Sequence, residues 1–266
     1  MKACIHIAFY FKENRLNYLD RMLKEYNKYP CEVDIYIHTN IQFPTERWNL
    51  YDNGLVTTIV HDFTNGDPMF LTWKCRELYP KQLDNYDVFM YSEDDILVPK
   101  KAFDYWFKNK DTVNAENYNL GFFRIQVDKT VDYEYITDAQ ESIFDRNIIS
   151  IGNKKFLINK FSYCAFWIYD KKEMDVFMSH PFYDLEYVKN DPLFNVVGIR
   201  EVSAWGLHLK HPYYNFKINR YKDTVFLLDE NEELDKDCRI YHLDEAYHYV
   251  PNGTFCCAKF ENCIRK

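Results

Sequence analysis

Short apolar runs alternate with amphipathic segments along the first half of the chain. An almost unbroken apolar run covers residues 3–11, and residues 14–29 follow it with apolar side chains at helical spacing. Further apolar runs predict strands at residues 33–38, 55–60 and 88–91. The run at 88–91 is continuous, which is typical of a central strand buried on both faces of a sheet. This alternation predicts an α/β fold with a mostly parallel central sheet flanked by helices.

Capping signals mark where two helices begin. Asp67 followed by proline predicts a helix that starts there and stops at Pro80, because aspartate caps a helix and proline fits its first turn. Asp170 has Glu173 three residues later, which is the spacing of a capping box. Both helices therefore have start points that the sequence defines.

The second half of the chain is less regular. Strands are predicted at 121–127 and 161–169, and a further helix is predicted from Asp191 towards His208. There is no internal repeat, low-complexity segment or flexible linker. We therefore expect one compact domain with a division of labour near residue 128.

Composition and charge narrow the class of protein. The chain has 266 residues, of which 47% are hydrophobic, so a substantial core is available. Its 23 tyrosines and 21 phenylalanines exceed what such a core needs, which leaves some rings for a binding groove. The net charge of −8 argues against nucleic acid as a partner, because phosphate backbones require a basic face. A nucleotide remains compatible, since its few phosphates need one metal and one or two cations.

The cysteines and the N-terminal segment indicate where the protein resides. None of the eight cysteines forms a Cys-x-x-Cys pair or a zinc spacing, so we expect reduced thiols and a cytoplasmic protein. Cys256, Cys257 and Cys263 would be free to form a disulfide in an oxidising compartment. No apolar run is long enough for a transmembrane segment. The opening run contains His6 and lacks a cleavage site before Lys12, so it predicts a first strand rather than a signal sequence.

Three acidic residues in a row are the most informative feature. Glu93, Asp94 and Asp95 come directly after the apolar strand and directly before another apolar stretch, residues 96–99. Adjacent carboxylates repel one another, and a divalent cation such as Mn²⁺ or Mg²⁺ would compensate for this repulsion. Such a triplet is otherwise a solvated turn. The apolar flanks favour the metal site, because they hold the triplet close to the core.

The segment Tyr91–Ile96 resembles the Asp-x-Asp-type motif of the GT-A glycosyltransferases, in the Glu-Asp-Asp form of several plant, algal and giant-virus members. Four other fragments resemble the family in the expected order: 71–76, 121–124, 166–169 and 240–243. The resemblance implies a Rossmann-like GT-A fold. In it, residues 1–128 would bind the donor, a nucleoside-diphosphate sugar with UDP as the expected nucleotide. Residues 129–266 would bind a glycan acceptor and carry catalysis.

The same resemblance implies roles for the acidic residues and for one histidine. Asp95 would bind Mn²⁺ or Mg²⁺ directly, and Glu93 or Asp94 would contact the ribose, or the metal through water. His242 would be a further metal ligand or a diphosphate contact, although a histidine in this context is by default a half-buried strand residue. His208 and His211 are the alternatives.

The donor also needs cations and a surface for the base. Arg76 is the first candidate for the diphosphate and Lys74 the second, and surface ion pairs with Glu77 or Asp67 are the alternative for both. Residues that follow strand ends would contact the base and ribose, since ligands gather at the carboxyl ends of parallel strands. These are Phe9, Tyr10, Thr39 and Asn40.

An inverting transfer needs a carboxylate base for the acceptor hydroxyl. Glu201 is the first candidate, because Trp205 and His208 share its face of the predicted helix and tryptophan stacks on sugars. Its ordinary alternative is an exposed residue paired with Arg200 or Lys210. Asp191 and Glu186 are the next candidates, and Asp184 is also a candidate. Helix capping is the alternative role for Asp191, as it is for Asp170.

Two other classes of protein stay open. A metal-dependent nucleotidyltransferase shares acidic clusters and a related sheet, but usually carries a glycine-rich loop after its first strand, whereas residues 10–13 contain no glycine. A non-catalytic sugar-binding protein is the third reading, and the intact acidic triplet argues against it.

Overall fold

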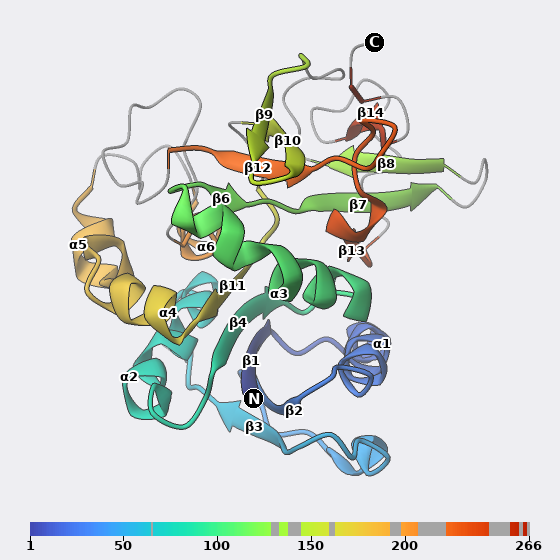
Figure 1. Ribbon diagram of the computed structural model, residues 1–266. Coiled ribbons are helices and arrows are strands. Elements are labelled where there is room, and N and C mark those ends of the chain that lie inside the picture. The colour runs from blue at the N-terminus through green and yellow to red at the C-terminus, as the bar shows by residue number, and fades with distance from the viewer. Residues whose placement is uncertain are drawn as a thin grey trace. The chain divides into compact units, whose positions relative to one another are not determined.

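The structure is a computed structural model that describes residues 1–64, 66–128, 133–137, 145–159, 163–191, 198–206, 222–244, 256–260 and 263–264. The chain divides into two compact units (Figure 1). The first unit comprises Met1–Ile96 and Ala165–Gly206, and the second comprises Leu97–Cys164 and Leu207–Lys266. The expected division near residue 128 coincides with neither junction. Instead, the chain leaves the first unit directly after the acidic triplet and later returns to it.

The first unit is built on a five-stranded sheet in the order β11-β4-β1-β2-β3. Its strands are β1 (Lys2–Phe9), β2 (Glu32–Thr39), β3 (Val56–Val60), β4 (Val88–Glu93) and β11 (Phe166–Asp170). The first four run parallel, and β11 pairs antiparallel with β4. The predicted α/β fold with a mostly parallel sheet is therefore confirmed. The register sets Ala8 beside both His38 and Glu93, so the ends of these strands share one edge of the sheet.

Helical segments flank this sheet, with α1 on one side and α2 and α4 on the other (Figure 1). They are η1 (Glu13–Arg15), α1 (Leu16–Tyr26), η2 (Glu46–Trp48), η3 (Pro68–Glu77), α2 (Tyr79–Gln82), α4 (Lys171–Met178), η4 (Pro181–Tyr183), α5 (Leu185–Lys189) and α6 (Ile199–Ser203). The α1 helix buries the apolar stripe that the sequence predicted, namely Leu19, Met22, Leu23 and Tyr26. Asp170 and Glu173 form the predicted capping box at the start of α4.

Two helix predictions need correction. The segment after Asp67 is a 3₁₀ helix, and Pro80 lies in the first turn of α2 instead of ending a helix, since proline lacks only an N–H that this position does not need. The helix expected as far as His208 ends at Ser203. Gly206 has a φ of 56°, which the right-handed helix does not allow, and a Cβ there would lie 1.9 Å from the Tyr169 hydroxyl.

The second unit contains a four-stranded sheet in the order β6-β12-β10-β9 and a five-stranded sheet in the order β14-β8-β7-β13-β5. Their strands are β5 (Ile96–Leu97), β6 (Asn119–Leu120), β7 (Phe123–Asp128), β8 (Tyr133–Thr137), β9 (Ile148–Ile151), β10 (Lys154–Asn159), β12 (Thr224–Leu227), β13 (Arg239–His242) and β14 (Cys256–Lys259). The helical segments are α3 (Lys100–Ala115) and η6 (Lys236–Cys238). Phe123 stacks on Phe226 with ring centroids 4.0 Å apart, and both rings are buried. Neither α3 nor most of these short strands was predicted from the sequence.

Across the described ranges, no helix combines the length and the apolarity that crossing a membrane requires. Six cysteines among these residues are buried and carry free thiols, including Cys263. The side chains of Cys256 and Cys257 lie outside the described residues.

Candidate functional site

The acidic triplet occupies the turn that follows β4. Glu93 is the last residue of the strand, and Asp94 and Asp95 connect it to β5. The Ser92 hydroxyl lies 3.0 Å from the carbonyl oxygens of both Glu93 and Ile96, which fixes the shape of this turn. Asp94 and Asp95 are each only 8% exposed. The sequence prediction that the triplet is held close to the core is confirmed.

Arg15 lies against both aspartates. Its Nη2 donates to Asp94 Oδ1 at 3.0 Å and to Asp95 Oδ2 at 2.5 Å, and its Nε lies 2.9 Å from Asp94 Oδ2. Burial and the neighbouring Asp95 raise the pKa of Asp94 to about 7, against the opposing effect of the Arg15 charge. Two carboxylates that repel each other are thus held together by one cation.

The first turn of α6 approaches the triplet from another side. The Arg200 Nε lies 3.9 Å from Glu93 Oε1, and its Nη2 lies 3.1 Å from Glu201 Oε1. Glu201 also folds back over Gly198, where a Cβ would meet its Oε2 at 2.2 Å. Glu201, the predicted base, is therefore linked to Glu93 of the triplet through Arg200. The Glu201–Arg200 ion pair, which was the alternative role of Glu201, is also present.

The rest of the predicted acceptor face differs from expectation. Trp205 is 6% exposed, so it has no open face on which a sugar would stack. His208 and His211 lie outside the described residues. Asp191 follows α5, and its backbone N–H donates to Val188 O at 3.0 Å. Its role as a base stays a prediction.

The other acids considered for catalysis have structural roles. Asp170 caps α4, and Asp184 caps α5 by accepting from the N–H groups of Glu186 and Tyr187. Glu186 pairs with Lys189 at 2.7 Å on the same helix. These contacts account for all three carboxylates without a substrate.

The donor set fits a divalent cation. Among the residues that the structure describes, no three His, Cys, Asp or Glu side chains gather as a ready metal cage. Mg²⁺, however, is usually held by one or two carboxylates together with substrate phosphates and water. Asp94 and Asp95 supply such a pair, and their oxygens already converge on a single cationic group. They are therefore the residues that would hold the metal.

His242 belongs to the second unit. It is the last residue of β13, it is buried, and its Nδ1 lies 2.8 Å from Gln126 Oε1. This hydrogen bond orients the ring, as expected of a structural histidine buried in a strand. Its role as a metal ligand stays a prediction.

The residues that follow the strand ends divide into buried and accessible ones. Phe9 is fully buried and packs edge-on against Phe43, and its contact with the base or ribose stays a prediction. Thr39 is also fully buried. Asn40 Oδ1 accepts from the Phe11 N–H at 2.7 Å and so shapes the loop after β1. Tyr10 is 41% exposed and remains a candidate for ribose or base contact.

Arg76 is a structural clamp. Its guanidinium donates to the carbonyl oxygens of Phe182, Tyr183 and Ser203, and its charge lies 3.8 Å from the centre of the Trp73 ring. The side chain is buried, and burial lowers its pKa. The charge of Arg76 thus holds η4 and α6 against η3. Its role as a diphosphate ligand stays a prediction.

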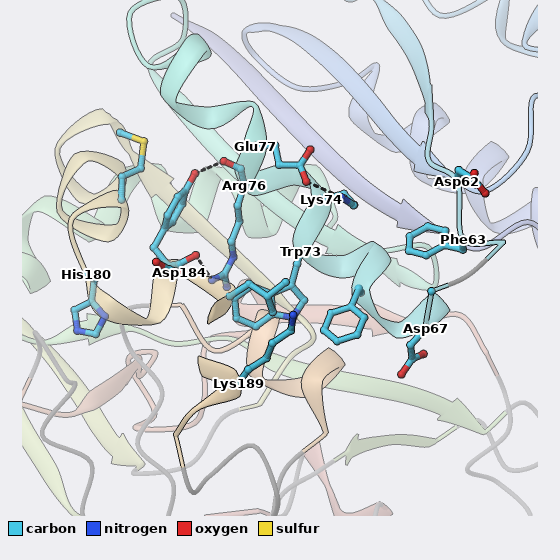
Figure 2. Close-up of a pocket in the computed structure, with 15 residues that line it drawn as sticks. Asp62, Phe63, Asp67, Trp73, Lys74, Arg76, Glu77, His180, Asp184 and Lys189 are labelled. Carbon is cyan, nitrogen blue, oxygen red and sulfur yellow. Dashed lines mark hydrogen bonds and ion pairs between the residues drawn. The ribbon is translucent and has the colours of Figure 1, made fainter. Parts of the chain in front are cut away.

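A pocket of about 650 Å³ opens beside this clamp, between η3 and the segment from α4 to α5 (Figure 2). Its aromatic lining includes Phe63, Phe70 and Trp73, and Lys74 lines it with its ammonium 2.7 Å from Glu77. The other charged lining residues are Asp62, Asp67, Arg76, Asp184 and Lys189. The Trp73 indole N–H donates to Ile199 O at 2.9 Å, which joins the pocket wall to α6.

Two features escaped the sequence analysis. Arg15 follows β1 at the edge where ligands gather, and this position was the signal that would have identified it. A buried chain of side chains also crosses the sheet. His6 Nε2 lies 3.0 Å from Gln82 Oε1, His6 Nδ1 lies 2.8 Å from His38 Nε2, and His38 Nδ1 lies 2.9 Å from His61 Nε2. No spacing in the sequence predicts this chain, because its members come from separate strands and loops.

Comparisons with known proteins give structural similarity only. No family model matches the chain, and no curated protein matches it. Among solved structures, the apo form of the glycosyltransferase GlyE of Streptococcus pneumoniae TIGR4 is similar with a TM-score of 0.41 and 10% identity, over 76% of this chain and 42% of that one. S. aureus TarS is similar with a TM-score of 0.36 and 10% identity, over 66% of this chain and 29% of that one. TarS 1–349 in complex with UDP-GlcNAc has a TM-score of 0.33 and 10% identity, over 66% of this chain and 47% of that one. The matched region thus spans less than half of each of these proteins.

Proposed function

We propose that this chain is a metal-dependent glycosyltransferase. It would move a hexosyl or pentosyl group from a nucleoside-diphosphate sugar, with UDP as the first candidate nucleotide, to a hydroxyl of a glycan acceptor in the cytoplasm. One observation carries the proposal. The buried carboxylates of Asp94 and Asp95 converge on one cation at the carboxyl end of a parallel strand. That is the donor set and the position at which a diphosphate and its metal are held in sheets of this kind.

Each residue of the candidate site has a distinct role in this proposal. Asp95 and Asp94 would hold Mn²⁺ or Mg²⁺, which neutralises charge on the leaving diphosphate when it is bound. Tyr10 and Asn40 lie after β1 and β2 and would contact the base and ribose. Glu201 would accept the proton of the acceptor hydroxyl in an inverting transfer, and its proximity to the triplet through Arg200 supports this assignment.

Binding measurements test the metal and the donor together. We expect Mn²⁺ with UDP to raise the melting temperature of the parent protein, because the ligand binds the folded state, and we expect EDTA to remove the effect. GDP, CMP and ATP in the same assay rank the nucleotides. Asp95→Asn should lose most of the stabilisation and of the Mn²⁺-dependent turnover of UDP-sugars. Asp84→Asn removes an exposed carboxylate of the same unit and serves as the matched control.

The outcomes separate the three readings. Full activity of Asp95→Asn, or of the parent in EDTA, contradicts the metal-dependent mechanism. Release of pyrophosphate from a nucleoside triphosphate without turnover of any UDP-sugar indicates a nucleotidyltransferase, and binding without turnover indicates a sugar-binding protein. Within the glycosyltransferase reading, Glu201→Gln should reduce transfer by roughly 10²–10⁴-fold and leave UDP binding intact.

A further inference from the structure

Arg15 is placed to act on the acidic pair as a whole. It is the last residue of η1, directly before α1, in the connection that follows β1. Its guanidinium spans both carboxylates, with Nη2 shared between Asp94 and Asp95 and Nε facing the second oxygen of Asp94. Three of the four carboxylate oxygens of the pair thus face one guanidinium.

A guanidinium and a divalent cation compete for the same oxygens. A metal held by both Asp94 and Asp95 needs an oxygen that Arg15 now faces, because both oxygens of Asp94 lie against the guanidinium, and two cations on the same oxygens repel each other. The metal therefore requires Arg15 to give up at least one contact. Once it has moved away from the aspartates, Arg15 is still a cation with a planar fork of N–H donors. Such a fork matches the oxygens of a phosphate in bidentate geometry.

We infer that Arg15 is a tethered cation that exchanges partners during donor binding. In the metal-free protein it neutralises Asp94 and Asp95. When Mn²⁺ or Mg²⁺ arrives with the nucleoside diphosphate, the metal takes over the carboxylates and Arg15 turns to the diphosphate. Arg15 is thus a donor-binding residue that makes the site select the metal and the diphosphate together. This inference rests on the proposed function.

The side chain has room for such an exchange. It is 21% exposed, in contrast to the buried guanidinium of Arg76, and its guanidinium carbon lies 5.6 Å from the centre of the Tyr18 ring. A side chain that served only to fix the loop after β1 would stay on the aspartates in every state. The two roles therefore predict different responses to mutation.

Removal of Arg15 should shift two affinities in opposite directions. Titration of Arg15→Gln with Mn²⁺ alone, at about pH 8, should show binding roughly tenfold tighter than in the parent, because a competing charge is gone. Titration with UDP at saturating Mn²⁺ should show binding roughly tenfold or more weaker, because the diphosphate has lost a charged donor. Arg15→Lys keeps the charge without the planar fork, so both of its affinities should lie between those of the parent and those of Arg15→Gln.

Arg47→Gln is the matched control. Arg47 forms a forked pair with Asp20 in the same unit, so this variant removes the same charge and breaks the same kind of contact away from the triplet. It should leave both affinities unchanged. Melting temperatures report whether each variant folds. If Arg15→Gln folds only when Mn²⁺ is added, this rescue by the metal alone supports the exchange. If Mn²⁺ does not rescue folding, and Arg15→Lys also shows no opposite shifts in Mn²⁺ and UDP affinity, the exchange is contradicted.

Two kinds of failure are distinguishable. If the parent binds Mn²⁺ and UDP but Arg15→Gln moves both affinities in the same direction, or neither, the partner exchange is wrong and the proposed function stands. If the parent binds neither Mn²⁺ nor UDP, the proposed function fails, and the role of Arg15 fails with it.

Discussion

The buried Arg76 gives the sharpest test of how the first unit is held together. Arg76→Met keeps the length and the apolar stem of the side chain but removes the guanidinium. The carbonyl oxygens of Phe182, Tyr183 and Ser203 then lose their donor, and Trp73 loses its cation. Both losses act on the same junction of η3 with η4 and α6.

The size of the effect follows from these contacts. Three hydrogen bonds to a charged donor at ~1.5 kcal/mol each give about 4–5 kcal/mol. Part of this is offset, because the variant no longer buries an ion. We therefore expect the free energy of unfolding to fall by about 3 kcal/mol, which corresponds to a melting temperature lower by roughly 6–12 °C in a chain of this size.

Urea denaturation of Arg76→Met beside Lys74→Met measures this difference. Lys74 is a half-buried neighbour on η3 whose ion pair is with the exposed Glu77, so its loss should cost less than ~0.5 kcal/mol. If Arg76→Met unfolds like the parent protein but fails to bind UDP with Mn²⁺, the clamp is wrong and the sequence-based assignment of Arg76 to the diphosphate is supported.

Two further predictions concern pH and backbone crowding. Burial lowers the pKa of His6 from 6.5 to about 3, so between these values the unfolded chain binds a proton that the folded chain does not. Burial lowers the pKa of His38 and of His61 as well, so stability is complete above pH 6.5 and falls by at least ~1.4 kcal/mol per pH unit as the pH drops below it. Urea denaturation in an Asp94→Asn background, which removes the opposite contribution of that carboxyl, should show this slope at about pH 5–6.5, and an unchanged stability refutes it. Gly54 and Gly152 both have positive φ, but a Cβ at Gly54 would lie 2.2 Å from a backbone oxygen whereas nothing lies within 4 Å at Gly152. Gly54→Ala should therefore cost clearly more than the ~1–2 kcal/mol expected of Gly152→Ala, and equal losses would show that crowding does not matter there.

The sequence predicted those parts of the fold that local patterns determine. The four parallel strands of the first unit follow from short apolar runs, and the capping box of Asp170 and Glu173 follows from a three-residue spacing. The position of the acidic triplet at the end of β4 was also predictable, because the strand before it is apolar throughout.

Contacts between distant residues were not predictable in this way. The carbonyl partners of Arg76 lie 106 to 127 residues further along the chain, so nothing near Arg76 distinguishes a clamp from a phosphate ligand. The Arg15 contacts likewise span 79 and 80 residues. The helix expected as far as His208 failed for another reason. Its apolar periodicity continues past Gly206, but the backbone there turns left-handed against Tyr169.

The discontinuity of the first unit has a consequence for synthesis on the ribosome. The strand β4 emerges early, whereas its neighbour β11 is made only after residues 97–164. Until then one edge of an apolar strand has no partner, and such an edge templates pairing between nascent chains. A shortened protein that ends at residue 96 would keep this edge open permanently. Early termination of this chain would therefore produce aggregation-prone fragments instead of a smaller folded domain. Rapid synthesis of residues 97–170 shortens the time for which the open edge of β4 is exposed.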